Sequence, residues 1–136
     1  MVCQFEVRVK LFVSIAAALI LFLGARVHAE QPAWTKHVSE ADKARPNPVA
    51  SDPASVSAGQ KLYADKCAHC HGANGEGKGH SPSLQTETVH ALTPGELEWV
   101  IAHGLSLHRM PSFESLSQDE RWQIVAYVQS LPKAAK

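Results

Sequence analysis

The sequence turns on one short stretch, Cys67-Ala68-His69-Cys70-His71, in which two cysteines stand three positions apart and a histidine follows the second. On a helical turn, residues three apart share a face, so both sulfurs can reach the two vinyl groups of one porphyrin. The imidazole of His71 then points at the iron from the same side, as the proximal axial ligand. This C-x-x-C-H pattern is the signature of covalent haem attachment through Cys67 and Cys70.

Two other interpretations of the cysteine pair are a redox dithiol and part of a zinc site. A thioredoxin-like dithiol should stand beside a βαβ pattern, which this chain lacks, and a structural zinc site usually has four Cys or His ligands. No third cysteine follows residue 29, although His69 and His80 could in principle complete a zinc site. Both alternatives fit less well than haem attachment.

Length and charge allow one domain and argue against a nucleic-acid partner. The 136 residues suit a single domain, and 13 Lys plus Arg balance 13 Asp plus Glu. Without residues 1–29 the chain keeps 10 basic against 12 acidic residues, which makes it slightly acidic. We therefore expect docking on partners to depend on local patches rather than on net charge.

The first 29 residues are typical of an export signal. Arg8 and Lys10 precede an uncharged run, Leu11 to Ala25, which ends near a small-x-small site at Ala29. The run is shorter than the roughly 20 residues of a spanning helix, so we expect cleavage near Ala29 and a soluble periplasmic or otherwise exported protein. A retained N-terminal anchor is the alternative, and only then would the membrane be a partner.

Residues 30–54 are expected to form an extended, proline-containing arm. Four prolines stand in this stretch, and residues that precede proline favour extended conformations. Trp34 is its one large apolar side chain. It either packs back on the domain, because indole has much apolar area to bury, or remains a lone surface aromatic.

The first helix of the domain is expected to run from about Ala58 to Ala68, with Ser55 or Ser57 as its cap. Gly59, Tyr63, Cys67 and Cys70 recur at helical spacing, so one face would end in the two thiols. A glycine inside a helix costs about 1 kcal/mol relative to alanine, which is tolerable where another helix must approach closely. A frayed first turn is the alternative.

Two later helices carry clearer signals. Thr93 with Glu96 and Ser117 with Glu120 have the spacing of capping boxes, and Pro94 suits a first helical position. The first of these helices should end at Gly104, and the second should run from about Gln118 to Ser130. Their apolar faces are expected to comprise Leu97, Val100 and Ile101, and Trp122, Val125, Tyr127, Val128 and Leu131.

Between the first two helices, Gly72 to His80 includes four glycines and is expected to be a loop. It lacks the lysine and hydroxyl ending of a P-loop, so phosphate binding is disfavoured. Pro82 and Leu84 follow, where a backbone carbonyl could orient the ring of His71. For Trp99, core packing is one interpretation, and donation of its indole N–H to a haem propionate is the other.

Met110 is the only methionine after residue 29, and it stands in a loop directly before Pro111. Methionine usually fills gaps in a core. A haem held by one histidine, however, needs either a sixth ligand or an open site, and methionine opposite histidine is the pairing of electron-transfer cytochromes. Met110 is therefore the candidate ligand and His108 its competitor, whereas His80, His90 and His103 are expected to be solvated or packed.

From Ser55 to Leu131 the chain resembles the small bacterial single-haem class I c-type cytochromes. The resemblance rests on these motifs together with Met110-Pro111-x-Phe113 and an aromatic-rich last helix. It implies an all-α, cytochrome c-like fold in which residues 55–136 pack three to five helices around one covalently bound haem. It also implies that His71 and Met110 are the axial ligands, and that the carbonyl of Pro82 accepts a hydrogen bond from His71.

The function implied by the resemblance is that of a one-electron carrier and not an enzyme. Its partners would be a dehydrogenase, an oxidase or another cytochrome. A haem enzyme subunit or a gas-binding haem sensor, with an open or weakly held sixth position, is the alternative, and Met110 is the residue that discriminates between them.

Overall fold

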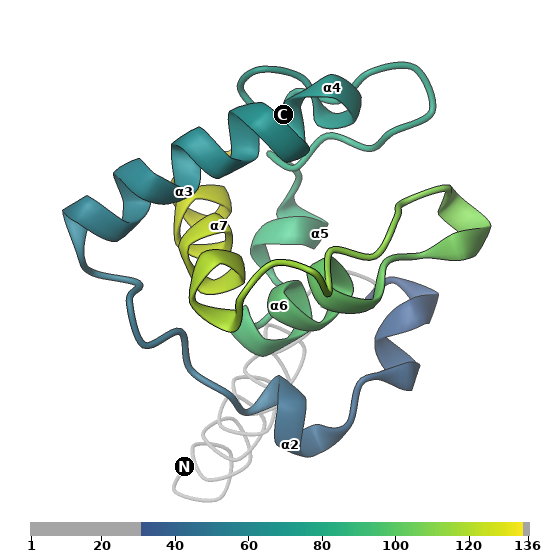
Figure 1. Ribbon diagram of the computed structural model, residues 1–136. Coiled ribbons are helices and arrows are strands. Elements are labelled where there is room, and N and C mark those ends of the chain that lie inside the picture. The colour runs from purple at the N-terminus through teal and green to yellow at the C-terminus, as the bar shows by residue number, and fades with distance from the viewer. Residues whose placement is uncertain (1–30, 135–136) are drawn as a thin grey trace, which may run out of the picture.

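The computed structural model of the protein describes residues 31–134 (Figure 1). The predicted export signal lies outside the described residues. In chain order the elements are the 3₁₀ helix η1 (Ala33–His37), α2 (Glu40–Lys43), α3 (Pro53–Lys66), α4 (Ala68–His71), α5 (Glu87–His90), α6 (Pro94–His103), the 3₁₀ helix η2 (Ser106–His108) and α7 (Gln118–Ser130). Residues 31–134 form no strand, only isolated bridges, which confirms the all-α fold class.

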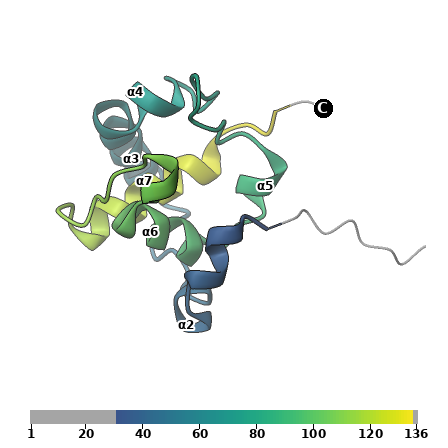
Figure 2. The ribbon, with the colours of Figure 1, turned by 90° about the vertical axis from the view of Figure 1, so that its right-hand side faces the viewer.

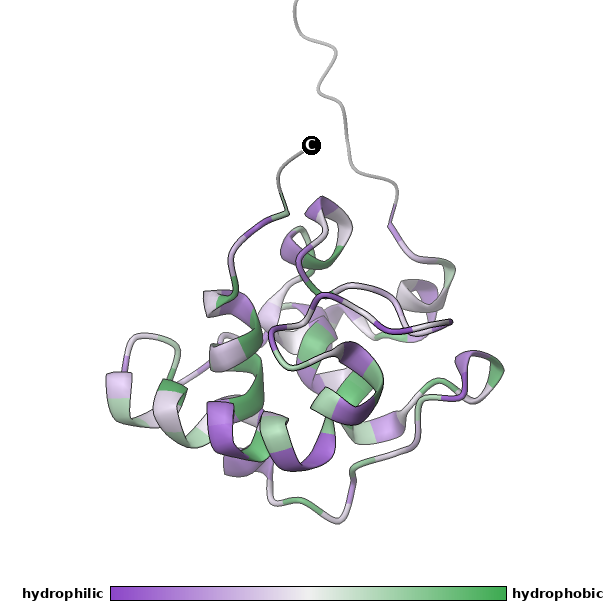
Figure 3. Ribbon diagram, turned by 90° about the horizontal axis from the view of Figure 1, so that it is seen from above, coloured by the Kyte–Doolittle hydropathy of each residue, from purple (hydrophilic) through white to green (hydrophobic). Residues whose placement is uncertain are grey.

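The three long helices are α3, α6 and α7, and the other α-helices are single turns (Figures 1 and 2). Polar and apolar residues alternate along these helices, as expected where one face of each meets a core (Figure 3). The predicted apolar faces of α6 and α7 are all buried. Tyr63, Ile124 and Val125 are the most completely buried large side chains. None of the helices within 31–134 is both long and apolar enough to cross a membrane.

The capping boxes predicted for α6 and α7 are confirmed. Thr93 and Ser117 each accept from the backbone N–H three residues on, and Glu96 and Glu120 reach back to the backbone of the cap. These bonds satisfy amide groups that the first helical turn leaves without partners. The bounds of both helices therefore follow from neighbours in the sequence.

The predicted start of the first helix was wrong. Helix α3 begins at Pro53, and the carboxylate of Asp52 accepts from Ala54 and Ser55 at 3.2 and 3.1 Å. Asp-Pro resembles a linker in sequence, yet aspartate is a strong helix cap and proline suits the first helical position. The helix also ends at Lys66 instead of about Ala68, so it stops just before the C-x-x-C-H motif at Cys67.

Gly59 is the point where α3 crosses α7. A Cβ at Gly59 would lie 2.5 Å from the carbonyl carbon of Gln123 and 3.1 Å from the amide nitrogen of Ile124. The close helix approach that was expected at this glycine is therefore present, and the backbones of the two helices nearly touch. Beside this crossing, the rings of Tyr63 and Tyr127 meet with centroids 5.1 Å apart.

The segment that was expected to be an extended arm instead forms η1 and α2, and it packs against α6 and α7 (Figure 1). The amide of Asn47 donates to the carbonyl of Trp122 at 3.0 Å, and the guanidinium of Arg45 lies over the same indole. Gly95 lies so close to the backbone carbonyl of Asp42 that a side chain there would clash. These contacts offset the loss of conformational entropy when the segment becomes ordered. The local bias toward extended backbone before proline therefore does not decide its structure.

Candidate haem-binding site

The two thiols of the motif differ in how far they are buried. Cys67 both ends α3 and starts α4, and its φ of −115° breaks the helix at that point. The amides of Cys70 and His71 donate to the carbonyl of Cys67 at 3.1 and 2.9 Å, which closes the turn. Because the helix is broken, Cys70 does not continue the buried face of Gly59 and Tyr63 as predicted. It is exposed, whereas Cys67 is half-buried.

No disulfide joins Cys67 to Cys70. Burial, and to a lesser extent the nearby Cys70, raises the pKa of the Cys67 thiol to about 11. A thiol with a raised pKa is mostly protonated at neutral pH, and a protonated thiol is a poor redox nucleophile. This property counts against the dithiol interpretation.

His71 is held by the residue that the resemblance implied. Its Nδ1 lies 3.0 Å from the carbonyl oxygen of Pro82. A carbonyl can only accept, so Nδ1 carries the proton and Nε2 keeps its lone pair for a metal. The ring is thus fixed in both orientation and tautomer.

The loop between His71 and Pro82 is tied down at several points. The amide of Gly77 donates to the carbonyl of His71 at 2.7 Å, and the hydroxyl of Tyr63 donates to the carbonyl of Gly72 at 2.8 Å. Gly77 has a φ of +85°, and a Cβ there would lie 2.8 Å from the amide of Ser83. Only glycine fits this position, where the chain turns back toward Pro82.

Met110 lies on a second, equally defined loop. Its amide and its carbonyl pair with the carbonyl and the amide of Leu105 at 3.1 and 2.9 Å. Gly104, at φ +71°, lies so close to the Met110 carbonyl that a Cβ would meet this oxygen at 2.6 Å. The Met110 side chain is half-buried and packs against the hydrophobic core, as do Cys67 and Leu84. The structure therefore brings Cys67 of the motif, Leu84 of the loop that follows it, and Met110 of the second loop against one hydrophobic core.

The competing imidazoles have other environments. His108 is exposed on η2 and lines a pocket shared with η1. His80 and His103 are exposed, and Nδ1 of His103 bonds the carbonyl of Trp99 at 2.8 Å. His90 is half-buried, and its Nε2 is the buried side-chain polar atom within 31–134 that has no hydrogen-bond partner.

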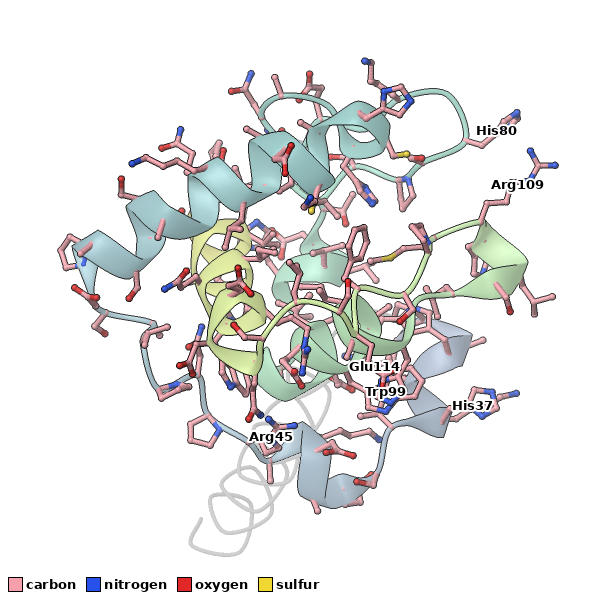
Figure 4. All side chains as sticks on the ribbon, viewed as in Figure 1. His37, Arg45, His80, Trp99, Arg109 and Glu114 are labelled. Atoms are coloured by element: carbon pink, nitrogen blue, oxygen red, sulfur yellow. The ribbon has the colours of Figure 1, made fainter. Side chains whose placement is uncertain are left out.

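Trp99 is not brought together with the other predicted site residues. Its indole stacks on Trp34 at 6.3 Å, with the planes 4° apart, and on the imidazole of His103 at 4.4 Å. Figure 4 shows Trp99 beside η1 and α2, at the opposite end of the molecule from α4. Trp99 therefore has the packing role rather than a contact with the haem site. Of the two alternatives for Trp34, the structure shows the one in which it packs back on the domain.

Several contacts of this region could not be read from the sequence. The carboxylate of Glu98, which is 3% exposed, accepts from Arg121 at 2.8 Å and from Arg45 at 3.1 Å. The Tyr63 hydroxyl that secures the Gly72 carbonyl was also missed. No local signal marks either contact, because the partners are far apart in sequence or carry no special motif.

The donor set fits a covalently held haem and not a zinc ion. Among the residues that the structure describes, no group of three or more His, Cys, Asp or Glu side chains could hold a metal. The chain instead offers the cysteine pair of the motif, an oriented imidazole and a thioether, which are the groups that c-type haem uses. Together with the all-α fold, this set defines the class of c-type cytochromes.

The comparison with family models agrees. Residues 54–128 match the model described as "Cytochrome C oxidase, cbb3-type, subunit III", and the chain belongs to this family of cytochrome c domains. Membership implies one covalently bound haem c. The matched residues begin within α3 and end within α7.

Curated relatives contain this domain as a part. The chain is 31% identical over 105 residues to the cbb3-type cytochrome c oxidase subunit CcoP of Rubrivivax gelatinosus. This match covers 76% of the chain and 33% of the relative. It is 35% identical over 75 residues to dihydro-heme d1 dehydrogenase of Pseudomonas aeruginosa, covering 54% and 15%. It is 36% identical over 86 residues to quinohemoprotein alcohol dehydrogenase ADH IIB of Pseudomonas putida, covering 62% and 12%. The chain thus spans a third or less of these relatives.

A solved structure supports the fold. Cytochrome CL from the methylotroph Methylophaga aminisulfidivorans MPT superposes with a TM-score of 0.58 at 24% identity, over 81% of this chain and 73% of that one.

Proposed function

We propose that the chain is a one-electron carrier whose haem iron is held by His71 and Met110. The observation that carries this proposal is the position of Met110. Its side chain packs against the same core as Cys67, whereas the competing residue His108 is exposed. An exposed imidazole such as that of His108 would have to leave solvent and reorganise its loop to reach the same place. Methionine opposite histidine raises the reduction potential and suits electron transfer.

When bound, the haem supplies the one-electron cycle between ferric and ferrous iron. The chain supplies the rest. Cys67 and Cys70 hold the group through thioether bonds, the Pro82 carbonyl fixes the ring of His71, and the Leu105 pairing fixes the loop of Met110. Because both ligand loops are hydrogen-bonded to the chain, we expect little rearrangement between the two redox states.

The relatives suggest the setting. One is an oxidase subunit and two are dehydrogenases, so we propose that the partners of this chain are redox proteins of these kinds. The leader-like residues 1–29 support export with cleavage near Ala29, or retention as an N-terminal anchor. Both placements suit a carrier that does no chemistry on a substrate of its own.

The optical spectrum of the ferric protein tests the ligand assignment. We expect the methionine-sulfur charge-transfer band in the wild type and in His108→Leu. It should disappear in Met110→Leu, whose ferrous form should bind carbon monoxide and whose reduction potential should fall. Circular dichroism of all three proteins checks that each remains folded.

Two results would contradict the proposal. Ready binding of carbon monoxide by the ferrous wild type would favour a sensor or an enzyme with an open sixth position. Absence of the band from the wild type, together with carbon monoxide binding by ferrous His108→Leu but not by ferrous Met110→Leu, would identify His108 as the ligand instead.

A further inference from the structure

The 3₁₀ helix η1 and the loop of Met110 meet along an open pocket of about 300 Å³. Residues of η1 form one wall, and Gly104 to His108 form the other. The lining comprises Ala33, Trp34, Lys36, His37, Gly104, Leu105, Ser106, Leu107 and His108. The segment that was expected to be an extended arm therefore forms one surface with the proposed ligand loop.

This surface is basic although the chain as a whole is not. No acidic residue lines the pocket. Exposed basic or imidazole side chains surround it and continue along the same side of the molecule, and none of them is in an ion pair within residues 31–134. They are Lys36, His37 and His108 in the lining and His80 and Arg109 beyond it. Figure 4 shows His37, His80 and Arg109 projecting from this one side.

An exposed aliphatic side chain, that of Leu107, also lines the pocket. Leu107 is 95% exposed and is the exposed large hydrophobic residue of the described chain. It lies in η2, which Arg109 ends in the left-handed conformation at φ 57°. A lone exposed leucine is ordinary. Here, however, it is held on a defined turn next to a pocket, two residues from Arg109 and three from Met110.

We propose that η1 and η2 together form the docking surface for an acidic redox protein domain, with Leu107 as the apolar anchor. This inference rests on the proposed function, because only a carrier needs a reversible partner at this position. Interfaces of this kind combine an apolar centre with a charged rim, and the rim sets the encounter rate and the orientation. A carboxylate-bearing partner complements Lys36 and Arg109.

The charge distribution favours a protein partner that presents carboxylates locally. The chain after residue 29 has 12 acidic against 10 basic residues, so its net charge repels an acidic partner at a distance. Attraction therefore arises only where the basic side faces the partner. An anionic membrane surface is the rival occupant, and vesicles can distinguish the two.

A gold electrode coated with a mixed monolayer of carboxylate-ended and methyl-ended chains is the probe for the haem-loaded protein. We expect tighter adsorption and faster electron exchange there than on a hydroxyl-ended monolayer, with a strong dependence on salt. Lys36→Glu should weaken adsorption roughly threefold to tenfold, and Leu107→Ser roughly threefold. The matched control, Lys61→Glu, changes net charge equally but lies on the exposed side of α3, and it should weaken adsorption less than twofold.

Each other outcome has a definite meaning. Equal weakening by Lys61→Glu and Lys36→Glu would overturn the proposal, because net charge alone would then be responsible. Tight binding to phosphatidylglycerol vesicles, abolished by Leu107→Ser, would identify a membrane surface instead. Failure of small dissolved one-electron mediators to reduce and reoxidise the haem reversibly would refute the proposed function itself and not merely the docking surface.

Discussion

Gly59→Ala tests the helix crossing that organises the fold. The new Cβ would lie 2.5 Å from the carbonyl carbon of Gln123 and 3.1 Å from the amide nitrogen of Ile124, both of them backbone atoms of α7. Since backbone cannot turn away as a side chain can, α3 and α7 must separate by roughly 1 Å to restore ordinary contact. The change therefore opens the core around Tyr63, beside the crossing.

The two contributions to the free energy of unfolding have opposite signs. Overpacking of a well-packed core costs about 1–3 kcal/mol, and a clash with backbone belongs at the upper end. Replacing a helical glycine by alanine gains about 1 kcal/mol of helix propensity. We therefore expect Gly59→Ala to destabilise the protein by about 2 kcal/mol.

Denaturant unfolding of the haem-loaded protein, followed by circular dichroism, measures this difference. The midpoint should fall while the slope with denaturant stays constant. Ser57→Ala is the control, because Ser57 is exposed in the same helix and alanine there should stabilise by about 0.5 kcal/mol. A Gly59→Ala protein as stable as the wild type would refute the reasoning, since propensity alone would then account for the result.

Two further predictions concern buried polar groups. Glu98→Gln should destabilise by about 3 kcal/mol, because Arg121 loses a buried carboxylate, whereas Arg45→Ala, at the more exposed end, should cost about 1 kcal/mol. Equal losses in chemical denaturation would contradict this order. Burial raises the pKa of the Tyr63 hydroxyl well above its usual value near 10. The neutral hydroxyl thus contributes stability in full below about pH 10, and this stability is lost as the pH rises further. Tyr63→Phe should cost about 1 kcal/mol at neutral pH, and its deficit in thermal unfolding should narrow above about pH 10. If the stability deficit of Tyr63→Phe stayed constant with pH, ionisation of Tyr63 would not be the cause of the stability lost at high pH.

The local features of the fold were predictable because their partners are near in sequence. The capping boxes of α6 and α7 need only residues three apart, and the apolar faces repeat with the period of the helix. The start of α3 was missed for a related reason. Asp52-Pro53 has the composition of both a linker and a cap, and the choice depends on whether a following helix can bury its face.

The arm shows where prediction from sequence failed. Prolines bias the residues before them toward extended conformations, and this bias is local. The contacts of Asn47 with Trp122 and of Arg45 with Glu98 span 75 and 53 residues, and they organise the arm once α6 and α7 are in place. Trp99 was assigned two possible roles for the same reason, and only the stack with Trp34 showed which one its position suits.

The sequence by itself determined the chemistry of the site, because Cys67, Cys70 and His71 are adjacent on one turn and a cofactor needs no distant partner to be specified. The tertiary structure decided the use of that chemistry. It placed Met110 against the core and His108 on the surface, and it joined η1 to the ligand loop. These arrangements depend on which segments, distant in sequence, bury area against one another, and no short motif encodes that balance.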